Sequence, residues 1–560
     1  MTVLWGKRRG FRNHPDNSGV CTPVHRYCVI HDSGVWLCFR CRACVRLGSR
    51  YESGTGAPCK RVILMNRFFN SSSAVVLALV AAGCTTPVPQ ALKTTDVPAA
   101  GFTAPIMSDA QVWPKTDWWT TFGSPEMAGL VSDAQANNLD IAAAYARVLQ
   151  AEAQSGIARS SLFPTLNGSF DASRQGSHGR TITTGPGGVT TGTGRFTSSN
   201  SFSLGLDASY QLDIFGQNRN QYFSAEDALR ASRYAQQTVA LTVESNTARA
   251  YINVLALRER IKIARDNVEA VNRVLVIVKA KVENGVSSNL DLAQEQAQVA
   301  AQQAQIPGLV EQEREARYTL AVLLGRAPEG FDVTAETMAE IKPPPVQPGM
   351  PSELLLRRPD VAEAEASLAS AHGNVDAARA AFFPSIGLSG SGGFASSALG
   401  SLFNGTTLFY SIGASVLQTI FDGGLKASQS DLAKAQQLET IANYRSSVLN
   451  AFTDVESSLG TVSALAEQEH YLGVEVDNAR EALRISEIQY REGVADLLAV
   501  LQAQQTLFSA QDQLVQTRLA RLQSNVSLYQ ALGGGWTQTA EDNTQSWPVS
   551  GTRPALPEKR

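Results

Sequence analysis

The segment ARSSLFPTL at residues 158–166 returns 220 residues later as ARAAFFPSI at residues 378–386. Further along, Gly285 and Gly493, each followed by Val, lie 208 residues apart. A repeat of about 200 residues is far longer than the roughly 20–50 residues of a solenoid unit. The chain therefore contains a duplicated half-molecule, and we expect both halves to fold in the same way.

The charge of the chain is divided unevenly. The 560 residues have a formal net charge of −3, and only 18% of them are charged. Residues 1–64 hold 11 Lys and Arg against 3 Asp and Glu, so that residues 65–560 are acidic. Because phosphate binding requires a clustered basic surface, we expect no nucleic-acid partner for the main body.

Six of the seven cysteines also lie in residues 1–64. Cys38, Cys41 and Cys44, with histidines nearby, suggest a zinc site. Zinc sites normally pair two well-separated ligand couples, and this spacing does not. The alternative, which we favour, is that residues 1–64 are a mis-assigned upstream extension and that translation begins at Met65.

The residues after Met65 have the layout of an export signal. Arg67 supplies a positive charge, and residues 71–82 form a short apolar stretch that is too short to cross a bilayer as a helix. Cys84 follows Ala-Ala-Gly and resembles the bacterial lipobox, in which the cysteine is lipidated and becomes the new N-terminus. An incidental or buried cysteine is the alternative. Residues 84–117, rich in Pro, Thr and Ala, are expected to form an extended tether.

Two regions alternate apolar and polar residues with the period of β-strands. Residues 201–212 are the clearest example, with Phe, Leu and Tyr on one face and Ser, Asp and Gln on the other. The pattern predicts one β-hairpin per half, at about 166–214 and 385–420. A Gly/Thr-rich stretch in the first hairpin, residues 175–200, is expected to be a solvated loop.

These hairpins limit how the chain can cross a membrane. Beyond the export signal, no segment reaches the ~20 consecutive apolar residues of a transmembrane helix, whereas strands of about ten residues suffice when tilted. Four strands could also belong to a soluble sandwich, but no other strand-rich region exists to pair with them. Four are too few to close a barrel, which needs about eight, so closure requires several chains.

Long helices follow each hairpin. Residues 217–284 contain neither Gly nor Pro and predict a helix of ~100 Å at 1.5 Å per residue. Residues 425–492 are the second copy. Residues 287–324, interrupted at Pro307, and residues 494–532 are expected to return antiparallel to them. Helices of this length pack along one another as coiled coils.

Glycines mark the turns between these helices. Gly285 and Gly493 are expected to supply the left-handed conformation that ends a helix. A shorter helix is predicted earlier in the chain, from the cap Ser124 to Leu162, where Pro164 ends it.

The order of these features resembles the TolC-like outer-membrane efflux factors, in particular the lipoprotein branch that serves resistance-nodulation-division (RND) pumps. The motifs that carry the resemblance are Cys84, WWTTF at 118–122, the two repeated segments, LLRRPDV at 355–361, YREGV at 490–494 and LYQALGGGW at 528–536. The resemblance implies a mainly α fold with a membrane β-barrel portion. Each chain of a trimer would add four strands to one twelve-stranded barrel above a periplasmic α-helical tube.

The expected organisation follows from the motifs and the resemblance together. It comprises the extension 1–64, a lipoprotein signal peptide at 65–83, the lipid anchor and tether 84–117, a first repeat 118–330 with its tip near 285, a linker 331–356, a second repeat 357–536 with its tip near 493, and a disordered tail 537–560.

The resemblance also implies a periplasmic gate at the helix turns. By position, the side chains that would narrow the channel are those of Leu290, Asp291, Leu498 and Gln502. The residues that would dock an adaptor are Gly285, Val286, Ser287, Gly493, Val494 and Ala495. A threefold ring of Asp291 would repel itself and bind cations, and the alternative is a solvated carboxylate on a helix face.

No catalytic constellation appears in the main body. The run Gly390–Gly393 is interpreted as a hairpin loop and not as a nucleotide cradle. We expect no enzyme activity, no metal, and no cofactor other than the covalent lipid on Cys84.

The predicted function is that of the exit duct of a tripartite efflux system for drugs or other small solutes. The expected partners are two further copies of the chain, a periplasmic adaptor (membrane fusion) protein, an inner-membrane RND-type pump and outer-membrane lipid. A protein-secretion duct of the same fold and a structural coiled-coil envelope lipoprotein are the alternatives.

Overall fold

The computed structural model describes residues 113–179, 182–185, 188–191, 195–343 and 351–537. The expectations for the extension, the signal peptide, Cys84 and most of the tether therefore lie outside the described residues. Within them, the two repeats have helices of equal length. The first repeat contains α3 (Leu139–Ser160), α4 (Gln217–Glu283) and α5 (Asn289–Leu323), and the second contains α7 (Pro359–Ala380), α8 (Leu425–Arg491) and α9 (Leu497–Ala531).

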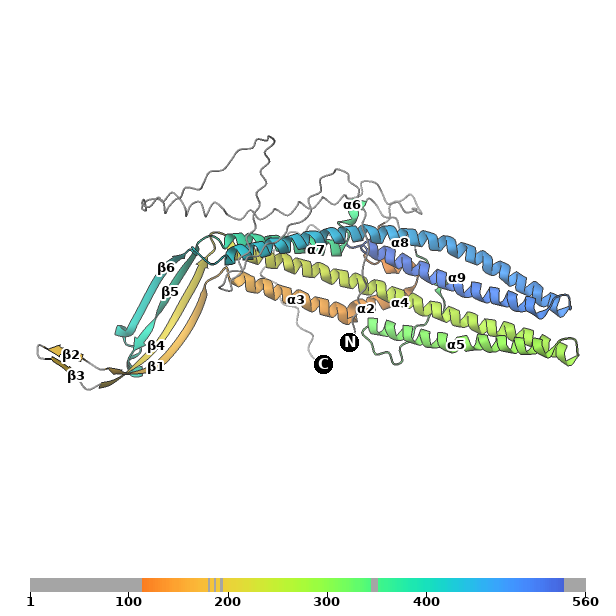
Figure 1. Ribbon diagram of the computed structural model, residues 1–560, viewed down its shortest axis with the longest axis horizontal. Coiled ribbons are helices and arrows are strands. Elements are labelled where there is room, and N and C mark those ends of the chain that lie inside the picture. The colour runs from red at the N-terminus through yellow and green to blue at the C-terminus, as the bar shows by residue number, and fades with distance from the viewer. Residues whose placement is uncertain (1–112, 180–181, 186–187, 192–194, 344–350, 538–560) are drawn as a thin grey trace, which may run out of the picture. The chain divides into compact units, whose positions relative to one another are not determined.

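The lengths of these helices repeat residue for residue. The α3 and α7 helices each have 22 residues, α4 and α8 each have 67, and α5 and α9 each have 35. Figure 1 shows α4 and α8 running alongside α3 and α7 and continuing alongside α5 and α9 to the two helix turns. Sixty-seven residues correspond to ~100 Å of continuous helix. The same helices connect the strands at one end to the turns at the other.

The strands form one antiparallel sheet in which the two hairpins lie side by side. The hairpin strands are β1 (Thr165–Gly179), β4 (Arg195–Leu212), β5 (Ser385–Ser396) and β6 (Leu408–Leu417). Their order in the sheet is β1-β4-β5-β6, and β4 and β5 join the two repeats. The outer strands β1 and β6 each have one neighbour among the described strands.

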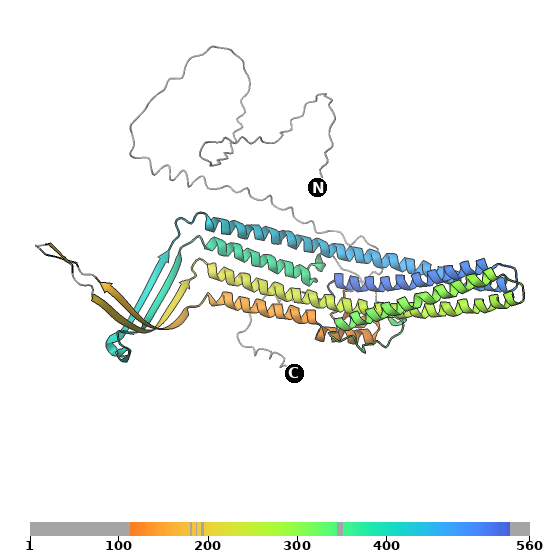
Figure 2. The same ribbon diagram turned by 60° about the horizontal axis from the view of Figure 1, so that its bottom comes forward.

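The solvated loop expected at 175–200 is a wrong prediction for most of that stretch. Its described residues belong to β1, β4 and a separate two-stranded sheet of β2 (Ile182–Gly185) and β3 (Gly188–Thr191). Threonine is β-branched and favours strands, and cross-strand pairing satisfies the backbone groups of the small residues between them. The first hairpin is therefore an extended ribbon, which Figure 2 shows reaching beyond β5 and β6.

The interpretation of Gly390–Gly393 as a hairpin loop is also wrong, because all four residues lie inside β5. Gly393 pairs with Gly205 of β4 at the junction between the two repeats. A Cβ atom at Gly393 would lie 2.2 Å from the Leu204 carbonyl oxygen. The glycine is there because two backbones approach closely and not because the chain turns.

Two helix boundaries also differ from the predictions. The helix expected from Ser124 to Leu162 is divided into α2 (Pro125–Asn137) and α3 by Asn138, which has an extended backbone. Asn138 caps α3, since its Oδ1 accepts hydrogen bonds from the N–H groups of Asp140 and Ile141 at 2.8 and 3.1 Å. The Asn138 side chain also donates to the carbonyl oxygen of Leu323, at 2.8 Å, and so ties this break to the end of α5.

The interruption expected at Pro307 is not present. The α5 helix continues through Pro307 from Asn289 to Leu323. A proline removes one helical hydrogen bond and clashes with the preceding turn, but packing along a neighbouring helix can outweigh that cost. The α5 helix packs along α4, which explains why the helix is not broken.

An aromatic core joins the start of the described chain to its end. Trp118 lies in the short helix η1 (Trp118–Phe122), and its ring centroid is 5.3 Å from that of Tyr529 in α9 and 5.6 Å from that of Phe122. Trp118 and Phe122 are fully buried. A second apolar cluster, along α4, α8 and α9 near the turns, contains Val271, Val278, Val476, Tyr490 and Val500.

The remaining short elements connect the repeats or close the second hairpin. They are α6 (Pro351–Leu354) and the 3-10 helices η2 (Met338–Glu340), η3 (Leu399–Ser401) and η4 (Gly405–Thr407). None of the described helices has the length and the apolar character that a transmembrane helix requires.

Candidate functional site

The two helix turns have the same backbone geometry. Gly285 and Gly493 have φ values of 71° and 78°, in the left-handed region. In the first turn the Val286 N–H donates to the carbonyl oxygen of Lys281 at 2.8 Å, and in the second the Val494 N–H donates to that of Gln489 at 2.8 Å. This six-residue closure, with glycine just past the helix end, is the Schellman motif.

The residues after the turns are chemically different. Ser288 caps α5 and forms a capping box with Asp291, in which the Asp291 N–H donates to Ser288 Oγ and the Ser288 N–H donates to Asp291 Oδ2, both at 3.2 Å. In the second turn Asp496 is the cap, and its Oδ1 accepts from the Ala499 N–H at 3.1 Å. Each turn thus has a carboxylate at the start of its second helix, where the positive end of the helix dipole favours it. In the second turn the carboxylate belongs to the cap residue Asp496, whereas in the first it lies three residues after the cap, at Asp291.

The Asp291 carboxylate accepts hydrogen bonds from Ser287 Oγ and from the Ser288 N–H. Ser287 Oγ donates to Asp291 Oδ2 at 2.5 Å, in addition to the capping-box contacts. The hydrogen bond from Ser287, followed by that from the Ser288 backbone, lowers the pKa of Asp291 below its ordinary value, although partial burial opposes the shift. Asp291 therefore keeps its negative charge at neutral pH.

Lys281 connects the first turn to the second repeat. Its Nζ donates to the carbonyl oxygen of Tyr490 and lies 4.4 Å from the centroid of the Tyr490 ring. Ser287 Oγ lies 3.5 Å from the Tyr490 hydroxyl on the same side. A cation at the last turn of a helix interacts favourably with the helix dipole, and a second attraction comes from the aromatic face. Lys281, Ser287 and Tyr490 form what we term the turn clamp.

Of the four predicted gate residues, Asp291 belongs to a hydrogen-bonded group with Ser287, a predicted docking residue, and this group reaches Tyr490. Leu290 and Leu498 are 65% and 55% exposed within one chain. Gln502 is exposed as well. The channel-lining role of all four predicted residues stays a prediction.

The predicted docking residues lie on and beside the turns. Val286 and Val494 are 73% and 78% exposed, an unusual environment for two large apolar side chains at equivalent positions. Ala495 is half-buried, and its N–H donates to the carbonyl oxygen of Gln489 at 3.3 Å.

The sequence reasoning missed Lys281. A signal was available, because Lys281 replaces the Gln489 of the second copy and Val282 replaces Tyr490, so the repeat difference covers two adjacent positions. Nothing in a single sequence, however, places the end of α4 beside the end of α8.

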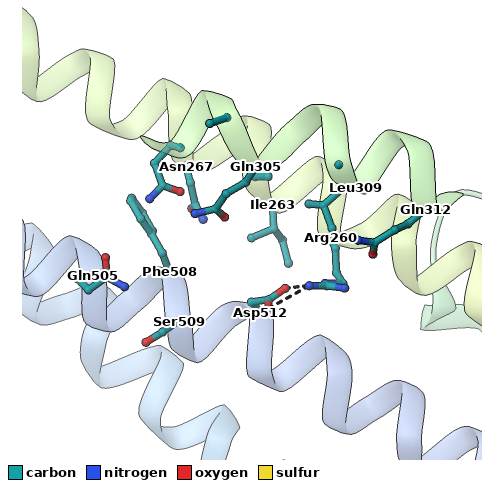
Figure 3. A pocket seen from close by; sticks show the side chains of 14 residues that line it. Arg260, Ile263, Asn267, Gln305, Leu309, Gln312, Gln505, Phe508, Ser509 and Asp512 are labelled. Atoms are coloured by element: carbon teal, nitrogen blue, oxygen red, sulfur yellow. Dashed lines mark hydrogen bonds and ion pairs between the residues drawn. The ribbon is translucent and has the colours of Figure 1, made fainter. Parts of the chain in front are cut away.

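A groove lies between α4, α5 and α9, farther from the turns. It has a volume of about 410 Å³. Figure 3 shows Asn267, Gln305 and Phe508 around it, with the Arg260 guanidinium directed at the Asp512 carboxylate. Arg260 Nε and one terminal nitrogen donate to Asp512 at 2.6 and 3.2 Å. Five of the fourteen lining residues carry amide side chains, and the ion pair among them joins the first repeat to the second.

The histidines of the described residues lie apart from one another. His372 Nδ1 is 3.0 Å from Gln437 Nε2, and its Nε2 is 3.5 Å from an Asp376 oxygen. The described residues contain no group of three or more His, Cys, Asp or Glu side chains able to hold a metal ion. The expectation that the chain is not an enzyme stays a prediction.

Two repeats, each with a strand hairpin continued by a long helix pair that ends in a polar turn, define the class of TolC-like outer-membrane channels. The family model "Outer membrane efflux protein" matches residues 130–326 and 350–534, one block for each repeat. The chain belongs to this family, and its function is efflux across the outer membrane.

Individual relatives agree with this assignment. The pyoverdine export outer membrane protein OpmQ of Pseudomonas putida KT2440 is 38% identical over 460 residues, which are 82% of this chain and 96% of the relative. The structure of the outer-membrane channel OprN has a TM-score of 0.71 at 29% identity and covers 79% of this chain and 98% of OprN. The open state of the Neisseria gonorrhoeae MtrE outer membrane channel has a TM-score of 0.70 at 29% identity, over 80% of this chain and 98% of MtrE.

Proposed function

We propose that three copies of this chain form the exit duct of a tripartite efflux system. The observation that carries this proposal is the sheet β1-β4-β5-β6, whose outer strands each have a free edge within the described chain. Unpaired strand edges attract further strands, and a closed barrel needs about eight or more. In an antiparallel order of four, β6 of one copy and β1 of the next are also antiparallel, so twelve strands from three copies close with uniform pairing.

The helices support the same assembly. Two helix pairs of equal length per chain give six similar pairs around a threefold axis. Six pairs of ~100 Å helices form a tube of the length needed to carry a solute through the periplasm to the barrel. The turns then form the periplasmic end of the tube.

The gate at that end would consist of the predicted channel-lining residues and the turn clamp. Leu290 and Leu498 provide exposed apolar side chains, and Asp291 provides an ionised carboxylate in each copy. The Lys281–Tyr490 contact joins the two helix pairs of one chain at this end. Its loss frees the pairs to separate, and separation widens the aperture.

The exposed turns suit a periplasmic adaptor protein. Val286 and Val494 are the largest apolar side chains at the turns, and both are exposed. In three copies they give six apolar positions on one ring, which matches an adaptor that binds the end of the tube. The adaptor would connect the duct to an RND-type inner-membrane pump.

The likeness to a pyoverdine export protein favours a small solute as cargo. Deleting the gene and measuring export of a dye panel and of pyoverdine, together with the secreted proteins, tests this assignment. We expect reduced small-solute export with unchanged secreted proteins. Loss of secreted proteins with normal solute export would contradict it.

We also propose that Cys84 carries a covalent lipid that anchors the mature chain in the outer membrane. The export-signal layout before Cys84 supports this proposal. Mass spectrometry of the purified protein is expected to find a lipid-modified N-terminus at Cys84. Any tryptic peptide from residues 1–60 would contradict the start at Met65.

A further inference from the structure

A single carboxyl group interrupts an uncharged part of the tip. Between Asp291 and Glu311, α5 contains one ionisable residue, Glu295. The facing part of α9, residues 497–511, contains none. Because the rest of this stretch is uncharged, the surroundings of Glu295 determine whether its carboxyl group is ionised.

Glu295 occupies a position where the helix pattern calls for an apolar residue. Leu292, Glu295 and Val299 follow one another at spacings of three and four residues, which places them on one face of α5. On α9, Val500, Gln504 and Leu507 have the same type of spacing. Both faces pack into the apolar cluster near the turns. One polar residue from each repeat therefore lies in a seam that is otherwise apolar.

Both polar side chains are completely buried and lack hydrogen bonds. Glu295 and Gln504 are each 0% exposed. Among the described residues, neither carboxylate oxygen of Glu295 and neither amide atom of Gln504 has a hydrogen-bond partner. An unpartnered buried carboxylate is costly, and the cost is largest for its charged form.

The charged groups around this pair do not compensate it. The α8 helix contributes Glu487, whose negative charge acts on Glu295. Arg273 of α4 and Arg491 of α8 act on Glu487 instead. The buried α4 residues of the cluster are apolar, namely Val271, Val274 and Val278.

The protonation state of Glu295 follows from this environment. Burial, opposed by the Gln504 side chain and reinforced by the negative charge of Glu487, raises the pKa of Glu295 to about 7. In its neutral form Glu295 has an O–H that can donate to the Gln504 side-chain oxygen. In its charged form Glu295 loses that donor and faces the Glu487 carboxylate, and Gln504 is the one described group acting on Glu295 that favours the charge.

We propose that Glu295 and Gln504 form a proton-sensitive contact between the two repeats. The α5 and α9 helices pack closely when Glu295 is neutral, and the packing is weakened when Glu295 is ionised, because the buried charge has no cationic partner among the described residues. The contact holds α5 of the first repeat to α9 of the second, close to the turn clamp. Its role in opening the tube rests on the proposed function of the tip as a gate. A more alkaline periplasm then favours the separated helix pairs.

The sign of the pH dependence follows from linkage. The packed state raises the pKa of Glu295 above the ordinary value of 4.5. The contribution of a raised pKa to stability is fully present below the ordinary value and is lost as the pH rises through the packed value. The contact is therefore strong at pH 5 and weak at pH 8.

Amide hydrogen exchange, measured by mass spectrometry on the full chain in detergent, tests the contact without relying on conduction. The readout is exchange in residues 289–302 and 497–510, for the wild type and Glu295→Gln at equal pH. We expect the wild type to exchange at least ~10-fold faster than the variant at pH 8 and within about fivefold of it at pH 5. An equal ratio at the two pH values would overturn the proposal.

Two further variants keep the test specific. Glu315→Gln changes an exposed glutamate of the same helix and is expected to behave as the wild type at both pH values. Gln504→Leu removes the acceptor, so exchange at pH 5 should rise above that of the wild type. Unchanged exchange of Gln504→Leu at pH 5 would also overturn the contact.

Bilayer conductance of the same proteins separates this inference from the proposed function. We expect the open probability of the wild type to rise from pH 5 to pH 8 and that of Glu295→Gln to stay constant. The exchange pattern without conductance would refute the duct and leave the contact intact. Conductance with identical pH profiles for the two proteins would refute the contact's gating role and leave the duct intact.

Discussion

The two helix turns have the same backbone conformation and differ in their side chains. Both end on a left-handed glycine with the same hydrogen-bond closure. The first turn then carries Lys281, Ser287 and Asp291 where the second carries Gln489, Ala495 and Ala499. Because the glycine closure is needed to reverse the chain, duplication preserved it. The polar residues are free of that requirement, and they differ between the copies. The first repeat provides the cation Lys281, and the second provides its aromatic partner Tyr490.

The largest effect should come from breaking what the turns share. Replacing Gly285 or Gly493 by Val forces a β-branched residue into the left-handed region, at a cost of about 2 kcal/mol in each case. No atom lies within 4 Å of a Cβ at either position, so the cost is conformational and should be similar in both turns. Thermal denaturation followed by circular dichroism measures it.

Gly460 provides the matched control. It lies in the middle of α8, and a Cβ there also meets no atom within 4 Å. Gly460→Ala should stabilise the helix by roughly 0.5–1 kcal/mol. Markedly unequal losses for the two turn variants would show that the turns are not equivalent in backbone terms.

The next effect concerns the clamp that only the first turn supplies. Lys281 is an α4 residue whose ammonium group contacts the last turn of α8 and the Tyr490 ring. Lys281→Met removes this cation at a cost of about 1 kcal/mol. The open probability of the reconstituted channel should therefore rise about fivefold, and Lys281→Arg should partly restore closure. Lys279→Met, two residues away and exposed, should leave gating unchanged. Equal effects of the two Met variants on open probability would show that the turn clamp does not keep the channel closed.

The two helix caps should contribute an amount similar to that of the clamp, and nearly equal to each other. Ser288→Ala and Asp496→Ala each remove the side chain that accepts the N–H of the third helical residue, Asp291 or Ala499, which costs about 1 kcal/mol. The acid dependence should differ between the copies. The pKa of Asp291 is lowered, so its contribution is present above the ordinary value of 3.8 and is lost as the pH falls below it. Urea denaturation at pH 7 and pH 3 should show a smaller loss on acidification for Asp291→Asn than for the wild type.

The smallest effect should be on ion selectivity. Asp291→Ala removes an ionised group near the proposed aperture, and Ala499→Asp adds one at the equivalent position of the second copy. Reversal potentials in a salt gradient should shift away from cations in the first variant and towards them in the second. Shifts of the same sign would contradict a channel-lining position for this pair of residues.

The architecture could be predicted from the sequence because the sequence contains the same half-molecule twice. The run without Gly or Pro at 217–284 and its repeat at 425–492, which contains only Gly460 and Gly473, predicted the helices that the structure gives as Gln217–Glu283 and Leu425–Arg491. The glycines at 285 and 493 predicted both turns. The failures have local causes. Asn138 breaks a helix because it caps the next one, and Pro307 does not break α5 because packing along α4 outweighs its cost.

The candidate site was less predictable for a different reason. Positions in one turn, such as Ser287 and Asp291, follow from the repeat and from capping rules. The Lys281–Tyr490 contact joins residues 209 apart, and the Glu295–Gln504 pair joins two helices of different repeats. Their lateral arrangement depends on how the helix pairs pack, which hydrophobic periodicity leaves undetermined.

Single-channel recording of the purified protein in a planar lipid bilayer tests the central claim most directly. The claim is that three copies form a duct that is closed at the turns. We expect stepwise conductance that is rare in the wild type and frequent in Leu498→Ser, Asp291→Ala and Lys281→Met. The complete absence of channel events in the wild type and in all three variants, with intact trimers in the membrane, would contradict it.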